Sequence, residues 1–328
     1  YYTVTHNGQQ VMEPSALGLK TSMGDLTRDL TLAGSEQKTI DLYYTMRGTK
    51  ASSADYKATQ AILQLQGKEG IRFSIIFQVS NHDIAFRYEV PRQKYQGKDM
   101  RRLRILSEVS SFSFPEGTTT FLSPQIGPET GWEQTKPSYE EVYSADAAMD
   151  TPSQYGHGYI FPALFHLGGA GKSGTLGYSG WALVSETGVG SNYCGSHLSD
   201  YQAGVGYTVD YPDRGENNGF GSDFAAIPLP GKTPWRTITI GTLSDIVETT
   251  ISYDLVEPLY QSSTDYQPGR YTWSWLIWQD KSVNYDDQVK FIDLASAMGF
   301  EYCLVDNWWD TQIGRDRMEE LSKYAQSK

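Results

Sequence analysis

The sequence lacks the features that mark several common classes of protein. It has two cysteines, Cys194 in a stretch rich in glycine and serine and Cys303 in an apolar run, which are too few and too differently placed for a disulfide framework. No apolar run approaches the roughly 20 residues that cross a membrane as a helix. The five histidines show no metal-ligand spacing. Composition therefore argues against a disulfide scaffold, a helical membrane protein and a histidine-based zinc site.

Positive charge is scarce as well. Lysine and arginine number 27 against 39 aspartates and glutamates, which gives a net charge of −12 and a pI near 4.9. The densest basic cluster, Arg101, Arg102 and Arg104, is short. Because such a surface repels phosphate backbones and anionic headgroups, we expect no nucleic-acid partner and no membrane insertion.

Aromatic residues are plentiful by contrast. The chain has 23 tyrosines and 8 tryptophans. These residues favour β-strands, and their flat rings stack on the apolar faces of pyranose sugars. The composition therefore favours a β-rich protein with sugar-facing surfaces.

Alternating apolar and polar residues dominate the first 245 residues, where helical periodicity is nearly absent. Two such runs, 71–77 and 84–90, flank the turn residues Ser80–Asp83, and Asn7-Gly8 forms a hairpin turn between two shorter runs. Further candidate strands lie at 103–109, 118–122, 175–184 and 235–240. We therefore predict a large β-sandwich domain over 1–245, with long connections at 123–162 and 188–234.

The pattern changes near residue 246. Apolar residues at helical spacing predict a helical linker over 246–265, and an α/β domain is expected to begin at 266 and run to 328. Within it, 271–278 is predicted to be a strand, 284–298 a helix capped by Asn284 and ended by Gly299, and 302–305 a parallel strand that buries Cys303. A further helix is predicted over 314–328. Because one such unit cannot bury a parallel sheet, we expect the sequence to be a truncated piece of a longer protein.

Candidate binding residues follow the second predicted strand. Asp306 stands at its carboxyl end, where parallel-strand enzymes carry their chemistry, and Trp308 and Trp309 follow in a loop where large rings are hard to explain as core. We expect Asp306 to contact substrate or to support the site; a helix cap is the alternative. Trp273 and Trp275 share one side of the first strand, and core packing is the alternative for both.

Several short segments stand in a fixed order along the chain: Pro14-Ser15-Ala16-Leu17-Gly18, Ser138-Tyr139-Glu140, Trp181–Glu186 with Tyr193 and Leu198, Pro234-Trp235-Arg236, Pro268-Gly269-Arg270, FIDLASAMGFEY and Leu304-Val305-Asp306. In order and spacing they resemble glycoside hydrolase family 97. This is a group of exported α-glucosidases and α-galactosidases with an N-terminal β super-sandwich, a (β/α)8 TIM barrel and a small C-terminal β domain. The resemblance covers the whole chain.

The resemblance implies that 266–328 are the first units of the (β/α)8 TIM barrel and that the catalytic carboxylates lie beyond Lys328. It implies a calcium ion at the active site with Glu140 of the sandwich as a metal ligand, or Glu141 if the register is one residue out. From composition alone, Glu140 would belong to a solvated acidic loop. The resemblance also makes Trp275 a sugar-stacking platform and the protein periplasmic or secreted.

These observations predict an exo-acting α-glycoside hydrolase. It would release terminal α-linked galactose or glucose from oligosaccharides with the help of calcium and two carboxylates. By the resemblance, an Asp at position 306 is closer to the retaining, galactosidase-like branch of the family. Two alternatives stay open: a non-catalytic carbohydrate-binding protein, and a calcium-independent barrel α-galactosidase of another family.

Overall fold

The computed structural model describes residues 1–46, 50–127, 141–168, 179–215, 222–260 and 262–328. Its contacts divide the chain into two units, Tyr1–Leu259 and Tyr260–Lys328. Glu140 and the rest of 128–140 lie outside the described residues.

One layer of the first unit is a ten-stranded antiparallel sheet. Its order is β14-β13-β15-β16-β21-β8-β7-β6-β5, with β20 paired to β8. The strands are β5 (Thr31–Thr45), β6 (Ser53–Gln66), β7 (Arg72–Val79), β8 (Asp83–Val90), β13 (Thr119–Leu122), β14 (Ser144–Ala148), β15 (Ala163–Leu167), β16 (Gly180–Thr187), β20 (Gly231–Lys232) and β21 (Trp235–Gly241).

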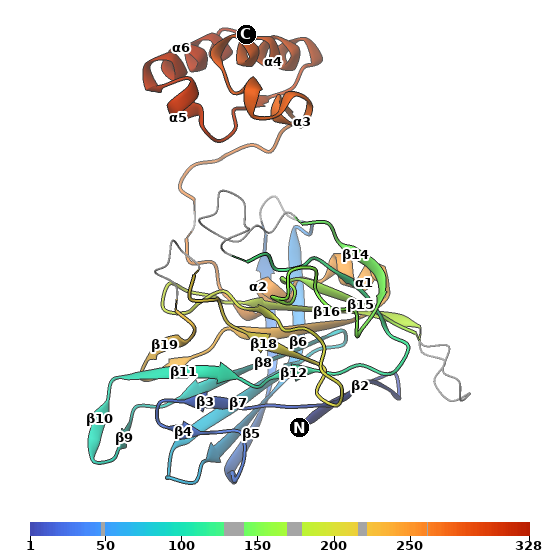
Figure 1. Cartoon of the computed structure of the whole chain (residues 1–328), viewed down its shortest axis with the longest axis vertical. Helices are drawn as coiled ribbons and strands as arrows, with labels where there is room; N and C mark the ends of the chain where they lie inside the picture. Colours follow the sequence, from blue (N-terminus) through green and yellow to red (C-terminus); the bar gives the residue numbers. More distant parts are fainter. Residues whose placement is uncertain (47–49, 128–140, 169–178, 216–221, 261) are drawn as a thin grey trace. The chain divides into compact units, whose positions relative to one another are not determined.

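Smaller sheets form the opposite layer, as Figure 1 shows for β3, β11, β12 and β18. Two sheets run in the orders β19-β11-β3-β4 and β12-β18-β17, and β1-β2 and β9-β10 are hairpins. Their bounds are β1 (Tyr2–His6), β2 (Gln9–Ser15), β3 (Leu19–Thr21), β4 (Gly24–Asp25), β9 (Gln93–Tyr95), β10 (Lys98–Met100), β11 (Arg102–Glu108), β12 (Ser111–Phe112), β17 (His197–Leu198), β18 (Tyr207–Asp210) and β19 (Ala225–Pro228).

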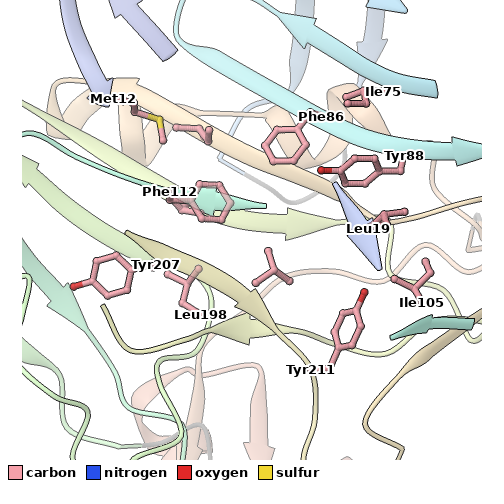
Figure 2. Packing of buried hydrophobic residues seen from close by; sticks show 14 of the residues in the cluster. Met12, Leu19, Ile75, Phe86, Tyr88, Ile105, Phe112, Leu198, Tyr207 and Tyr211 are labelled. Atoms are coloured by element: carbon pink, nitrogen blue, oxygen red, sulfur yellow. The ribbon is translucent and has the colours of Figure 1, made fainter. Parts of the chain in front are cut away.

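The main core lies between these layers. Phe86 and Tyr88 of β8 point into it from the large sheet and meet residues such as Leu19 and Phe112 from the opposite layer (Figure 2). Alternate residues along β8 are buried in this way because successive side chains of a strand point to opposite faces. The prediction of a β-sandwich is confirmed.

The predicted hairpin turn at Asn7-Gly8 is confirmed. Asn7 and Gly8 both have positive φ, 51° and 78°, as a tight hairpin between β1 and β2 requires. The two long connections, however, contain strands of their own. β14 lies in 123–162, and β17 to β20 lie in 188–234, where they are too short to show periodicity in the sequence.

Two short helices pack on the large sheet within the first unit. They are α1 (Leu243–Glu248) and α2 (Ile251–Leu255). Thr242 and Asp245 form a reciprocal capping box at the start of α1. Leu255 of α2 contacts a buried cluster that includes Ile76 and Trp235 of the sheet.

The second unit is built on two parallel strands, β22 (Tyr271–Trp273) and β23 (Tyr302–Leu304). Its helical segments are α3 (Trp275–Trp278), η2 (Gln279–Ser282), α4 (Tyr285–Met298), α5 (Trp309–Gln312) and α6 (Arg315–Gln326). The predicted caps of α4 are confirmed, since the Asn284 side chain accepts from the Asp287 N–H and Gly299 is left-handed at φ 66°. The (β/α)8 barrel stays a prediction.

The predicted strand over 271–278 is wrong in its second half. The chain leaves β22 after Trp273, and the Ser274 carbonyl accepts hydrogen bonds from the N–H groups of Ile277 and Trp278, which begins α3. Aromatic and branched residues favour a strand there, but the tertiary environment of Ser274 overrides that preference. Among the described residues, none of the helices is long and apolar enough to cross a membrane.

Candidate functional site

The candidate site lies just beyond the carboxyl ends of β22 and β23. Trp273, the last residue of β22, pairs in register with Leu304 of β23, two positions before Asp306. This register brings the Trp273 indole Nε1 to 2.8 Å from Asp306 Oδ2, to which it donates a hydrogen bond. The backbone N–H of Asn307 donates to the other carboxylate oxygen at 2.7 Å. Asp306 is therefore held by one N–H donor on each oxygen.

A pair of stacked indoles adjoins this carboxylate. The rings of Trp273 and Trp275 lie with centroids 5.7 Å apart and planes at 20°. Trp275 Nε1 donates to Asp280 Oδ1 at 2.8 Å, so each indole N–H is paired with a carboxylate. The sequence pattern placed Trp273 and Trp275 on one side of a strand, but it did not predict that their indole N–H groups bind Asp306 and Asp280.

A buried polar cluster supports the turn that carries these rings. Gln288 of α4 donates from Nε2 to Ser274 Oγ and to the Ser282 carbonyl, both at 2.8 Å. The hydroxyls of Ser274 and Ser282 share a further hydrogen bond at 2.8 Å. The three side chains are fully buried or nearly so. Burial makes such bonds costly to break, so they fix α3 and η2 against α4.

Trp308 and Trp309 differ in their surroundings. Trp308 has a φ of 67°, a left-handed conformation that bulky residues rarely adopt, and its side chain is 38% exposed. Trp309 begins α5 and packs against the apolar cluster that contains Ile292 and Leu321. Core packing therefore does not explain the ring of Trp308. The ring of Trp309 is explained in part by the core.

The described residues do not by themselves assemble a calcium site. Among them, no group of three or more histidine, cysteine, aspartate or glutamate side chains could hold a metal ion. Glu140, the predicted ligand, lies outside the described residues. The neighbouring Glu141 accepts a hydrogen bond from the Tyr155 hydroxyl at 3.0 Å, which raises the pKa of that tyrosine.

Glu186 of β16 has a role that its sequence position did not reveal. It pairs with Arg236 of β21, whose guanidinium is fully buried. Arg236 also binds Glu108 of β11 and Ser196 Oγ, and Ser196 in turn donates to Glu186. Burial raises the pKa of the neighbouring Cys194 thiol to about 11, although Arg236 opposes this rise.

Comparison with known proteins identifies a family whose model matches most of the chain. Residues 1–258 match the model described as the glycosyl-hydrolase 97 N-terminal domain. A probable retaining α-galactosidase of Streptomyces bingchenggensis (strain BCW-1) is 26% identical over 309 residues, which cover 93% of this chain and 42% of that protein. A retaining α-galactosidase of Bacteroides thetaiotaomicron is 25% identical over 366 residues, which cover 100% and 51%. The chain thus spans about half the length of these curated relatives.

Solved structures of glycosidases also superpose on almost the whole chain. The crystal structure of a β-arabinopyranosidase superposes with a TM-score of 0.89 at 51% identity, covering 99% of this chain and 50% of that one. A glycoside hydrolase family 97 enzyme from Pseudoalteromonas sp. strain K8, solved with panose, superposes with a TM-score of 0.74 over 99% of this chain and 49% of that one. At 20% identity, that second likeness concerns the fold alone.

Proposed function

Because the chain belongs to glycoside hydrolase family 97, we propose that it is part of an exo-acting glycoside hydrolase that releases a terminal sugar from oligosaccharides. The observation that carries the proposal is the match over 1–258 together with relatives named as glycosidases that extend over this chain almost entirely. The alternative of a calcium-independent α-galactosidase of another family is thereby set aside.

The names of the relatives reduce the range of candidate sugars further. They are named retaining α-galactosidases at 25–26% identity and a β-arabinopyranosidase at 51% identity. An α-D-galactopyranoside and a β-L-arabinopyranoside share one ring configuration from C1 to C4 and differ in the hydroxymethyl group at C5. We propose a pocket for this shared configuration, with the arabinopyranoside as the preferred substrate. A terminal α-linked glucose, which differs at C4, is the less favoured candidate.

The residues of the candidate site suit the recognition of such a sugar. Asp306 offers carboxylate lone pairs to sugar hydroxyls, and Trp275 offers a ring face for stacking. Trp308 and Trp309 would extend the apolar contact. The catalytic carboxylates are expected beyond Lys328. In the retaining reaction, one carboxylate attacks the anomeric carbon while another protonates the leaving oxygen, and water then hydrolyses the glycosyl-enzyme.

Calcium is a separate part of the proposal. A carboxylate such as Glu140 suits this hard cation, which takes six to eight oxygen ligands, and the ion would act as an electrostatic template for the sugar. The test is calorimetric titration of calcium into the metal-free, full-length protein, with Glu140→Gln compared with Glu141→Gln. Weaker binding in the first variant alone supports the assignment. Equal affinity in wild type and Glu140→Gln contradicts it.

Export to the periplasm or outside the cell is also proposed. Cell fractionation followed by immunoblotting would place the full-length protein, and recovery in the cytoplasm would contradict this location. A non-catalytic sugar-binding protein is the remaining alternative for the function as a whole. It predicts binding without turnover.

The activity is tested with the full-length protein and nitrophenyl glycosides of β-L-arabinopyranose, α-D-galactopyranose and α-D-glucopyranose. We expect hydrolysis of the first two and about 100-fold lower kcat/KM for the glucoside, because one misplaced hydroxyl leaves buried polar groups unpaired. The anomer first released, followed by NMR, should retain configuration. A preference for the glucoside would contradict the proposed sugar, and binding without hydrolysis would favour the sugar-binding alternative.

A further inference from the structure

We propose that Trp273 is a positioning residue for Asp306. Its indole N–H fixes the orientation of the carboxylate, and its ring ties that carboxylate to the stacking ring of Trp275. The inference rests on the proposed function, because it assigns Asp306 and Trp275 to one sugar. It adds a residue that the sequence indicated only as half of an aromatic pair.

The carboxylate of Asp306 is held at both oxygens. A free aspartate side chain rotates about its last torsion and can present either oxygen. In Asp306 the Asn307 N–H holds Oδ1 and the Trp273 indole holds Oδ2, at 2.7 Å and 2.8 Å. Each oxygen keeps one lone-pair direction for a further donor. The carboxylate is thus set to accept from sugar hydroxyls in a fixed plane.

Trp273 is itself held in place through its backbone and its ring. Its backbone belongs to the β22–β23 pairing, and its ring stacks on Trp275. The indole N–H of Trp275 in turn binds Asp280. The residue before Asp280, Gln279, has a positive φ of 56°. Asp280, Trp275, Trp273 and Asp306 therefore form one continuous chain of contacts. A shift of either indole would move both the stacking face and the carboxylate.

A positioning role for Trp273 differs from simple packing in its dependence on Asp306. If Trp273 only fills space, removing its N–H should have the same effect whether or not Asp306 carries a charged acceptor. If it acts through Asp306, its effect should disappear once Asp306 is changed. A double-mutant cycle makes this distinction directly, because only coupled residues give non-additive effects.

The experiment uses the full-length protein with Trp273→Phe, Asp306→Ala and the double variant. Trp278→Phe is the matched control, since that ring lies nearby on α3, is exposed and contacts Phe291. We expect Trp273→Phe to raise KM for the preferred nitrophenyl glycoside about tenfold with a smaller change in kcat, as for the loss of a hydrogen bond to a charged group. Asp306→Ala should lower kcat/KM at least as much. Trp278→Phe should leave both constants unchanged.

The decisive result is the double variant. We expect its kcat/KM to lie within about twofold of Asp306→Ala, whereas multiplied single effects would overturn the proposal. Trp273→His, which keeps a ring N–H, should recover part of the loss; recovery no better than in Trp273→Phe would also count against it. Should Trp273→Phe fail to fold, Trp273→Met, which also lacks the ring N–H and fills space flexibly, takes its place in the cycle.

The same proteins are titrated calorimetrically with free L-arabinose and D-galactose. This keeps failure of the inference distinct from failure of the proposed function. Binding that weakens non-additively in the cycle without any hydrolysis would support the positioning role while contradicting the enzyme assignment. If the Trp273 and Asp306 substitutions act independently on both binding and hydrolysis, the enzyme assignment is supported and the positioning role is contradicted.

Discussion

Arg236 donates two parallel hydrogen bonds to Glu108, from Nε to Oε1 at 3.0 Å and from Nη2 to Oε2 at 2.7 Å, and both side chains are fully buried. The third guanidinium nitrogen binds Glu186 and Ser196. One cation thereby links β11, β16 and β21 with the segment around Ser196. Bidentate geometry of this kind is specific to arginine, so lysine is a poor substitute.

Arg236→Met should destabilise the sandwich by about 3–5 kcal/mol, because it leaves two carboxylates buried without a cation. Urea unfolding followed by circular dichroism measures the change. The exposed pair of Arg92 and Asp99, at 2.8 Å, supplies the control, and Arg92→Met should change stability little. Equal midpoints for the two variants would show that the buried pair has no special role.

Two glycines with nearly equal φ provide a second test. Gly156 and Gly158 have φ values of 73° and 74°. A Cβ at 158 would stand 1.9 Å from the Leu198 carbonyl oxygen, whereas one at 156 would meet nothing within 4 Å. Gly156→Ala should cost about 1–2 kcal/mol from backbone strain alone. Gly158→Ala should cost clearly more, and equal losses in urea unfolding would contradict the close approach to Leu198.

The buried His197 should make the stability of the sandwich depend on pH. Burial lowers its pKa from 6.5, against the opposing influence of Asp210 and Asp213. The unfolded chain therefore takes up a proton near pH 6.5 that the folded chain resists. The contribution of His197 to the free energy of unfolding is therefore fully present above that pH. It is lost as the pH drops through 6.5 toward the folded pKa.

Replacing this residue should remove that contribution. Urea midpoints of wild type and His197→Gln, measured from about pH 7.5 to pH 5, should show a smaller decline in the variant. His157 and Glu186 also act on His197, so the comparison is made at constant ionic strength. Parallel pH curves would show that His197 is not responsible.

Trp275 should matter for sugar binding more than its exposed neighbour on α3. Trp275→Ala removes a ring that is stacked and hydrogen-bonded, and we expect at least a tenfold weaker affinity of the full-length protein for L-arabinose or D-galactose. Trp278→Ala removes a ring of the same size that lacks that stack. Isothermal titration calorimetry compares the two. A larger loss in Trp278→Ala would place the sugar elsewhere.

Local features of the fold could be predicted from the sequence because a few residues determine them. Asn7-Gly8 specified a hairpin, Asn284 and Gly299 specified the ends of α4, and alternation along 71–90 specified the β7–β8 pair. In each case the responsible residues lie within one element or turn.

Features that depend on distant residues were not predictable in this way. Glu186 reads as an ordinary acid at a strand end because its partner Arg236, which also binds Glu108, is far away in sequence. Trp275 reads as part of a strand because the residues that turn the chain, Ser282 and Gln288, act only once α4 is packed. Of the candidate site, the positions could be proposed from sequence, but the hydrogen bonds between them could not.

The order of strands in the large sheet has a consequence for biosynthesis. β8 ends at Val90 but pairs with β21, which begins at Trp235. At typical translation rates, roughly 7–30 s separate the emergence of these two segments from the ribosome. During that interval the nascent β5–β8 meander has an edge along β8 whose backbone N–H and C=O groups are not yet paired with β21. A chaperone that covers this edge during synthesis should therefore raise the yield of folded protein.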